Sequence, residues 1–179
     1  MTVVAATKYV ALEDLAALAE AGVEVVGENR AQDLQRKHER YGDAFRWHFI
    51  GHLQSRKAPL VSELCELCHS LASESAARRL TIPALVEVNL SGEASKSGID
   101  PTELPAFLRA YPDVRGLMTM PPLAAEVAAL RWRVALALAS NSGRRAASWM
   151  RYCARALATF SAATRRSRLL ASAAVMAWR

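Results

Sequence analysis

Four residues with reactive or hydrogen-bonding side chains stand in or directly after apolar segments. Lys8 follows VVAAT, Asn29 follows VEVVGE, His48 lies in FRWHFIG and Asn89 follows IPALVEV. A lysine amine that has lost its proton attacks carbonyl carbon, and apolar surroundings favour that loss. Asn and His side chains can donate to or accept from a bound ligand. The simpler interpretation of each residue is a polar side chain where a strand reaches the surface.

A second group of candidate ligands is the run Cys65-x-x-Cys68-His69, which is typical of metal or redox sites. A zinc site needs about four ligands, and no second ligand pair accompanies this run. The third cysteine, Cys153, lies far along the chain. We therefore expect Cys65 and Cys68 to pack as small buried hydrophobic residues, with no metal bound.

Apolar periodicity predicts the elements that must position these residues. Strands are expected over 3–7, 23–28, 45–51, 64–71, 82–90 and 114–120, and helices over 12–22, 29–42, 52–64, 73–80 and 100–111. Gly22 and Gly42 end two of the helices, Ser73 or Ser75 caps the fourth, and Asp100 caps the fifth. Six strand–helix steps predict an α/β fold with a parallel sheet, either doubly wound or a (β/α) barrel. The chain has no GxGxxG, and polar residues at the carboxyl ends of strands favour the TIM-type barrel, whose active sites lie there.

Composition excludes several classes of protein. The chain has 179 residues, of which 52% are apolar, so it is expected to be globular. It has no run of eighteen apolar residues, so no membrane partner is expected. The first predicted strand begins at once, which leaves no room for a leader segment. Three cysteines do not make a disulfide framework, and we expect a cytoplasmic protein.

The net charge of +6 is unevenly distributed. Residues 1–126 carry a net charge of −4, whereas residues 127–179 carry ten arginines and no acidic residue. The basic character therefore belongs to the C-terminal segment. We predict two parts, a barrel portion over 1–124 and an Arg/Ala-rich tail over 125–179. The tail is interpreted either as a frameshift product or as an extension that binds nucleic acid or lipid. We favour the frameshift product, because the tail shows no sustained amphipathic repeat.

Six motifs then occur in a fixed order: VVAATKYV, VVGENRAQD, WHFIGHLQSRK, HSLASES, VEVNLSGEASKSG and VRGLMTMPP. Together they resemble the pyridoxal phosphate homeostasis protein family, whose fold is similar to the N-terminal barrel of alanine racemase. The resemblance covers residues 2 to about 124. It implies pyridoxal 5'-phosphate (PLP) as the cofactor.

The resemblance also implies roles for single residues. Lys8 matches the lysine that forms a Schiff base with PLP, and Ala6 is small enough to leave room for a flat ring. Asn29, His48, Asn89 and Met118 match positions near the cofactor. The implied function is a carrier that holds PLP without turning over a substrate, and that supplies apo-enzymes as a monomer or weak dimer. The alternative is a PLP-dependent amino-acid racemase, which needs two acid–base groups; Lys8 can supply one, but no tyrosine from a second domain is available as the other.

The chain also departs from the family pattern. It lacks the family's helix before the first strand, and nothing after Leu123 matches the family's last two strands. The barrel is therefore expected to be incomplete, with about six βα units. In the family those missing strands hold the cofactor phosphate and an arginine that faces the pyridine nitrogen. We therefore expect this chain to bind PLP more weakly than a complete family member.

Overall fold

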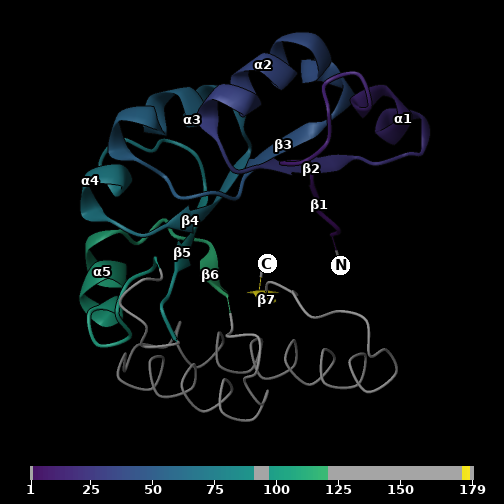
Figure 1. Ribbon diagram of the computed structural model, residues 1–179. Coiled ribbons are helices and arrows are strands. Elements are labelled where there is room, and N and C mark those ends of the chain that lie inside the picture. The colour runs from purple at the N-terminus through teal and green to yellow at the C-terminus, as the bar shows by residue number, and fades with distance from the viewer. Residues whose placement is uncertain (1, 91–96, 121–174, 178–179) are drawn as a thin grey trace, which may run out of the picture. The chain divides into compact units, whose positions relative to one another are not determined.

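The computed structural model describes residues 2–90, 97–120 and 175–177 (Figure 1). The chain divides into two compact units, Met1–Val86 and Glu87–Arg179, each of which is described by itself. The boundary predicted between 124 and 125, and with it the interpretation of the tail, lies outside the described residues. Among the helices of the described ranges, none has both the length and the hydropathy that a membrane span requires.

The first unit is built on a parallel sheet whose strand order follows the chain. Its strands are β1 (Ala5–Ala6), β2 (Val25–Glu28), β3 (Arg46–Phe49), β4 (Leu67–Leu71) and the start of β5 (Ala84–Glu87). Each strand pairs in parallel with the one before it. All five lie inside the predicted segments, although each is shorter than predicted. The predicted α/β class with parallel strands is confirmed.

The helices of this unit connect successive strands and lie on one side of strands β2 to β4 (Figure 1). They are α1 (Leu15–Glu20), α2 (Ala31–Tyr41), α3 (Ala58–Leu64) and α4 (Glu74–Ala77), with short 3-10 turns at Gly42–Ala44 and Ser55–Lys57. Gly22 ends the first helical segment with φ +77°, a conformation that favours glycine. The Ser73 hydroxyl accepts the N–H of Ala76, so the predicted cap is confirmed at Ser73.

Strand register decides which residues share a face of the sheet. Ala5, Val26 and Trp47 are register neighbours, and Trp47 packs against the ring of His38 on α2, so this set faces the helices. Ala6, Gly27 and His48 form the neighbouring set. Because side chains alternate along a strand, this second set faces away from α2. Large apolar residues fill the layer between the sheet and the helices, and Leu34, Phe49 and Val61 are fully buried there.

The second unit contains α5 (Leu104–Ala110), β6 (Gly116–Thr119) and β7 (Val175–Ala177). The sixth predicted strand is confirmed as β6. Its neighbour β7 runs antiparallel to it, which sequence patterns did not indicate. A (β/α) barrel contains parallel strands alone, so the antiparallel pairing of β7 with β6 departs from the expected TIM-type pattern.

The prediction that Asp100 caps the fifth helix is wrong, because α5 begins at Leu104 with Glu103 at its N-cap. Asp100 instead organises the turn that precedes α5. Its carboxylate accepts the N–H of Thr102 at 2.8 Å and the hydroxyl of Thr102 at 2.6 Å. Both hydrogen bonds favour the ionised form and hold the pKa of Asp100 below its usual value.

Candidate functional site around Lys8

Lys8 lies on a tight turn immediately after β1. The N–H of Thr7 donates to the carbonyl of Gly27 at 3.0 Å and extends the pairing with β2 by one residue. The N–H of Val10 then donates back to the carbonyl of Thr7 at 2.8 Å, which closes a β-turn with Lys8 and Tyr9 at its centre. The sequence therefore placed Lys8 correctly at the end of the first strand.

Within the described residues, Lys8 does not have the apolar surroundings that its neighbours in sequence suggested. Its side chain is exposed, and its Nζ lies 5.0 Å from the centre of the Tyr9 ring, which is itself 90% exposed. The error arose because the apolar neighbours in sequence, Val4 and Ala5, alternate in direction and do not surround the lysine. The amine is thus accessible to a ligand from solvent.

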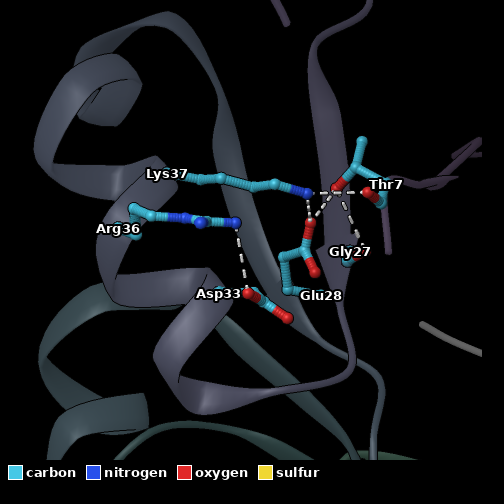
Figure 2. A network of polar contacts seen from close by, with 6 residues as sticks. All are labelled: Thr7, Gly27, Glu28, Asp33, Arg36 and Lys37. Carbon is cyan, nitrogen blue, oxygen red and sulfur yellow. Dashed lines mark hydrogen bonds and ion pairs between the residues drawn. The ribbon is translucent and has the colours of Figure 1, made fainter. Parts of the chain in front are cut away.

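A buried polar network surrounds Thr7, the first residue of this turn (Figure 2). The Lys37 ammonium, on α2, contacts Glu28 Oε1 at 2.6 Å and the carbonyl oxygen of Thr7 at 2.8 Å. The Thr7 hydroxyl donates to the same Glu28 oxygen at 2.6 Å. Lys37 is 2% exposed and Glu28 is 0% exposed. The network therefore joins the end of β1, the end of β2 and α2 through charged hydrogen bonds that water does not reach.

Sequence reasoning missed this network. A signal was present, because Lys37 follows Ala31 and Leu34 at helical spacing and so shares their buried face. A lysine on the apolar face of a helix needs a carboxylate partner, since an unpaired buried charge is costly. Glu28, at the end of the preceding strand, was the acidic residue in a position to supply it.

Ala6, at the end of β1, and Asn29, directly after β2, lie in the same unit as Lys8. Ala6 is exposed and pairs with Gly27 on the face of the sheet away from α2. Asn29 directly follows β2 and is half-buried. The backbone of Asn29 approaches Gly51 so closely that a Cβ on Gly51 would lie 2.0 Å from the Asn29 carbonyl oxygen. Glycine at position 51 thus fixes the path of the chain at Asn29.

His48 forms a buried pair with His69 of β4. Nε2 of His69 lies 2.9 Å from Nδ1 of His48, and the side chains are 1% and 0% exposed. Burial, helped by the charge of Arg46, lowers the pKa of His48 to about 4. Burial and the proximity of His48 lower the pKa of His69 to about 4 as well. Both rings are therefore neutral at pH 7, and one donates the hydrogen bond that the other accepts.

This histidine pair makes stability depend on pH. In the unfolded chain each histidine takes up a proton near pH 6.5, whereas in the folded chain it does so only near pH 4. The unfolded state therefore binds more protons as pH falls below 6.5, and folding becomes less favourable down to about pH 4. Between pH 7 and pH 5 we expect the free energy of unfolding to fall by about 2 kcal/mol for each histidine, from linkage.

Urea titrations at pH 7, 6 and 5 measure this dependence. The variant His69→Gln keeps a hydrogen-bonding partner for His48 and removes one titrating ring, so its pH dependence should be about half as steep. His38→Gln is the matched control, since His38 lies at the edge of the core beside Trp47. If His69→Gln loses stability toward pH 5 as steeply as the unmodified chain, the pair is not the cause.

Asn89 and Met118 lie in the second unit. The Asn89 N–H donates to the carbonyl of Ile99 at 3.0 Å, and its side chain is half-buried. Gly98, with φ +121°, passes so close that a Cβ there would lie 2.6 Å from the Asn89 nitrogen. Met118 is buried on β6, and its carbonyl accepts the N–H of Val88 at 2.9 Å. The two predicted residues therefore lie on adjacent segments of this unit.

Cys65 and Cys68 are buried, as their packing interpretation predicted. Burial and the neighbouring Cys68 raise the pKa of the Cys65 thiol to about 12, so it stays protonated and unreactive at neutral pH. Within the described ranges no three His, Cys, Asp or Glu side chains lie together in a way that would hold a metal ion.

Comparison with known proteins identifies what this arrangement resembles. The pyridoxal phosphate homeostasis protein of Aquifex aeolicus is 36% identical over 132 residues, which are 65% of this chain and 58% of that protein. The protein of the same name from Pseudomonas aeruginosa is 39% identical over 124 residues, 61% of this chain and 54% of its own length. The chain resembles the pyridoxal phosphate homeostasis proteins. It spans little more than half the length of these curated relatives. No family model matches it.

Solved structures support the same resemblance. PipY of Synechococcus elongatus PCC7942, solved without PLP, superposes with a TM-score of 0.69 at 28% identity, covering 82% of this chain and 77% of PipY. PipY with PLP bound superposes with a TM-score of 0.64 at 29% identity, covering 75% of this chain and 69% of PipY. Alanine racemase of Corynebacterium glutamicum has a TM-score of 0.52 at 16% identity, over 75% of this chain and 44% of the racemase, which supports a shared fold alone. The resemblance to pyridoxal phosphate homeostasis proteins that the motifs indicated is confirmed.

Proposed function

We propose that this chain binds PLP through Lys8 and takes part in PLP homeostasis, as the pyridoxal phosphate homeostasis proteins are named for doing. The observation that carries the proposal is the exposed Lys8 amine on a fixed turn at the end of β1. PipY, which has a similar structure, has been solved with PLP bound. In this proposal the chain carries PLP and does not convert a substrate.

The residues around Lys8 fit such a group chemically. PLP carries an aldehyde; the Lys8 amine would add to its carbon, a C=N bond would form, and one water molecule would leave to give a Schiff base. The side chain of Ala6 is a single methyl group, so it leaves room for an aromatic ring beside the sheet. The half-buried Asn29 amide can hydrogen-bond a ring substituent. The buried His48 would act as a fixed, neutral part of the wall.

Trapping of the bound cofactor tests the role of Lys8. The chain mixed with PLP should show an imine absorbance, and borohydride should reduce it to a stable label on Lys8. The variant Lys8→Ala should lose the absorbance and the label entirely, because it lacks the amine that forms the bond. Peptide mapping by mass spectrometry identifies the labelled residue.

Lys57→Ala is the matched control, since Lys57 is also solvent-accessible but lies away from β1, in the turn before α3. It should keep the full label on Lys8. A label found mainly on Lys57 or Lys96 would contradict the proposed site. Conversion of L-alanine to D-alanine by the PLP-loaded chain would contradict the carrier interpretation and favour a racemase.

We propose delivery of PLP to apo-enzymes, a monomer or weak dimer, a cytoplasmic location and no nucleic-acid partner. Asn89 and Met118 are proposed to contribute to PLP binding through the second unit. Weaker PLP binding was expected because nothing after Leu123 matches the family. That part of the chain lies outside the described ranges.

A further inference from the structure

The carbonyl oxygen of Thr7 accepts two hydrogen bonds from different parts of the chain. One comes from the Val10 N–H, which closes the turn that carries Lys8, and the other from the buried Lys37 ammonium, each at 2.8 Å. A carbonyl oxygen has two lone pairs, so both of its acceptor positions are used. The oxygen is thus held from the turn on one side and from α2 on the other.

This arrangement bears directly on Lys8, because the Thr7 carbonyl and the Lys8 N–H belong to the same planar peptide group. A fixed oxygen fixes that plane, and with it the direction in which the Lys8 Cα leaves the strand. Glu28 completes the arrangement, since one of its oxygens contacts both Lys37 and the Thr7 hydroxyl at 2.6 Å. Two contacts therefore tie this pair to the residue before Lys8: Lys37 donates to the Thr7 carbonyl, and the Thr7 hydroxyl donates to Glu28.

We propose that the buried pair Glu28–Lys37 is a positioning device for Lys8, which holds the turn so that the amine meets the PLP aldehyde in one orientation. The inference rests on the proposed function of Lys8 and adds to it two residues that do not themselves contact the cofactor. Lys37 works through its contact with the Thr7 carbonyl, and Glu28 holds the Lys37 side chain in place.

The helix also offers an internal comparison. Arg36 and Asp33 form a second ion pair on α2, at 3.4 Å, with side chains that are 63% and 34% exposed (Figure 2). Exposed pairs of this kind contribute little to stability, and the contacts drawn for this one do not reach the Lys8 turn. Its removal takes away one positive and one negative charge, as removal of the buried pair does, so the net charge of the chain is the same in both variants.

The test compares two double variants. In Glu28→Gln/Lys37→Met, uncharged side chains of similar size replace the buried pair; in the control, Asp33→Asn/Arg36→Met, they replace the exposed pair. Each is titrated with PLP, reduced with borohydride and mapped, after circular dichroism has established that it is folded. In the double variant we expect the Lys8 Schiff base to form about tenfold to a hundredfold less favourably, the range for a small misplacement of a reacting group. The control should match the unmodified chain.

A second measurement separates positioning from simple chemical reactivity. Acetic anhydride, a small reagent with no orientational requirement, should label Lys8 equally fast in both double variants and in the unmodified chain, since the amine is exposed throughout. If the buried-pair variant is not folded, Thr7→Val and Thr7→Ser replace it. Thr7→Val removes the hydroxyl contact with Glu28 and should weaken Schiff-base formation, whereas Thr7→Ser keeps the hydroxyl and should restore it.

The possible failures are distinguishable. If the unmodified chain carries no label on Lys8, the proposed function itself fails. If Lys8 is labelled in the unmodified chain and equally in the folded buried-pair variant, Lys8 keeps its role and the positioning inference fails. Slower acetylation of Lys8 in the variant would also overturn the inference, because the effect would then lie in the amine itself.

Discussion

The variant Lys37→Met is expected to lower the free energy of unfolding by about 3–5 kcal/mol, the cost of removing one partner of a buried ion pair. The substitution leaves the Glu28 carboxylate at 0% exposure without its counter-charge. It also removes the donor to the Thr7 carbonyl. Urea unfolding at pH 7, followed by circular dichroism, measures the change.

Two comparisons show whether the buried charge is the cause. Adding Glu28→Gln to Lys37→Met should recover part of the lost stability, because a neutral amide costs less to bury than an unpaired carboxylate. Arg36→Met, which breaks the exposed pair on the same helix, should change stability by about 1 kcal/mol or less. A double variant less stable than Lys37→Met alone would argue against this electrostatic account.

The variant Gly51→Ala is expected to cost about 3 kcal/mol or more, at the upper end of the range for overpacking a core. A Cβ at this position would lie 2.0 Å from the carbonyl oxygen and 2.6 Å from the carbonyl carbon of Asn29. These are backbone atoms, so no side-chain rotation relieves the overlap. The segment after β2 must shift, and we expect Schiff-base formation at Lys8 to weaken with it.

Gly22→Ala is the control for this substitution. Gly22 has φ +77°, but no atom lies within 4 Å of a Cβ built there. Alanine at this position carries only the strain of a left-handed conformation, about 1 kcal/mol. Thermal and urea unfolding should therefore rank the chains as unmodified, Gly22→Ala, then Gly51→Ala. Equal stability of the two alanine variants would show that the backbone at Asn29 yields easily.

The strands could be predicted because each is a short run of β-branched and apolar residues that ends at a polar residue. Lys8 and Asn29 were found in this way, since the end of a strand is a local property of the sequence. The apolar surroundings expected for Lys8 are not found among the described residues, because the surroundings of a side chain depend on which segments pack against its turn. The start of α5 at Leu104 was missed for a related reason, since Asp100 and Pro101 are equally suited to the turn before a helix.

The contacts that hold the site lie between segments far apart in the sequence, and residue types alone do not reveal them. His48 and His69 were each considered singly, the second as part of a cysteine motif, and their mutual hydrogen bond depends on the pairing of β3 with β4. Glu28 and Lys37 likewise meet only because α2 folds back over β2. Charged residues of these types are usually solvated, so a burial prediction requires the helix to be placed first.

The strand order of the first unit, which follows the order of synthesis, has a consequence for how the chain folds in the cell. Each of its strands after the first pairs with the one made just before it, and the Thr7–Glu28 contact spans only 21 residues of chain. Contacts of such short span form quickly. Each new strand of this unit therefore finds its partner already synthesised. The turn that carries Lys8 would thus be locked into place once α2 has emerged, well before the second unit exists.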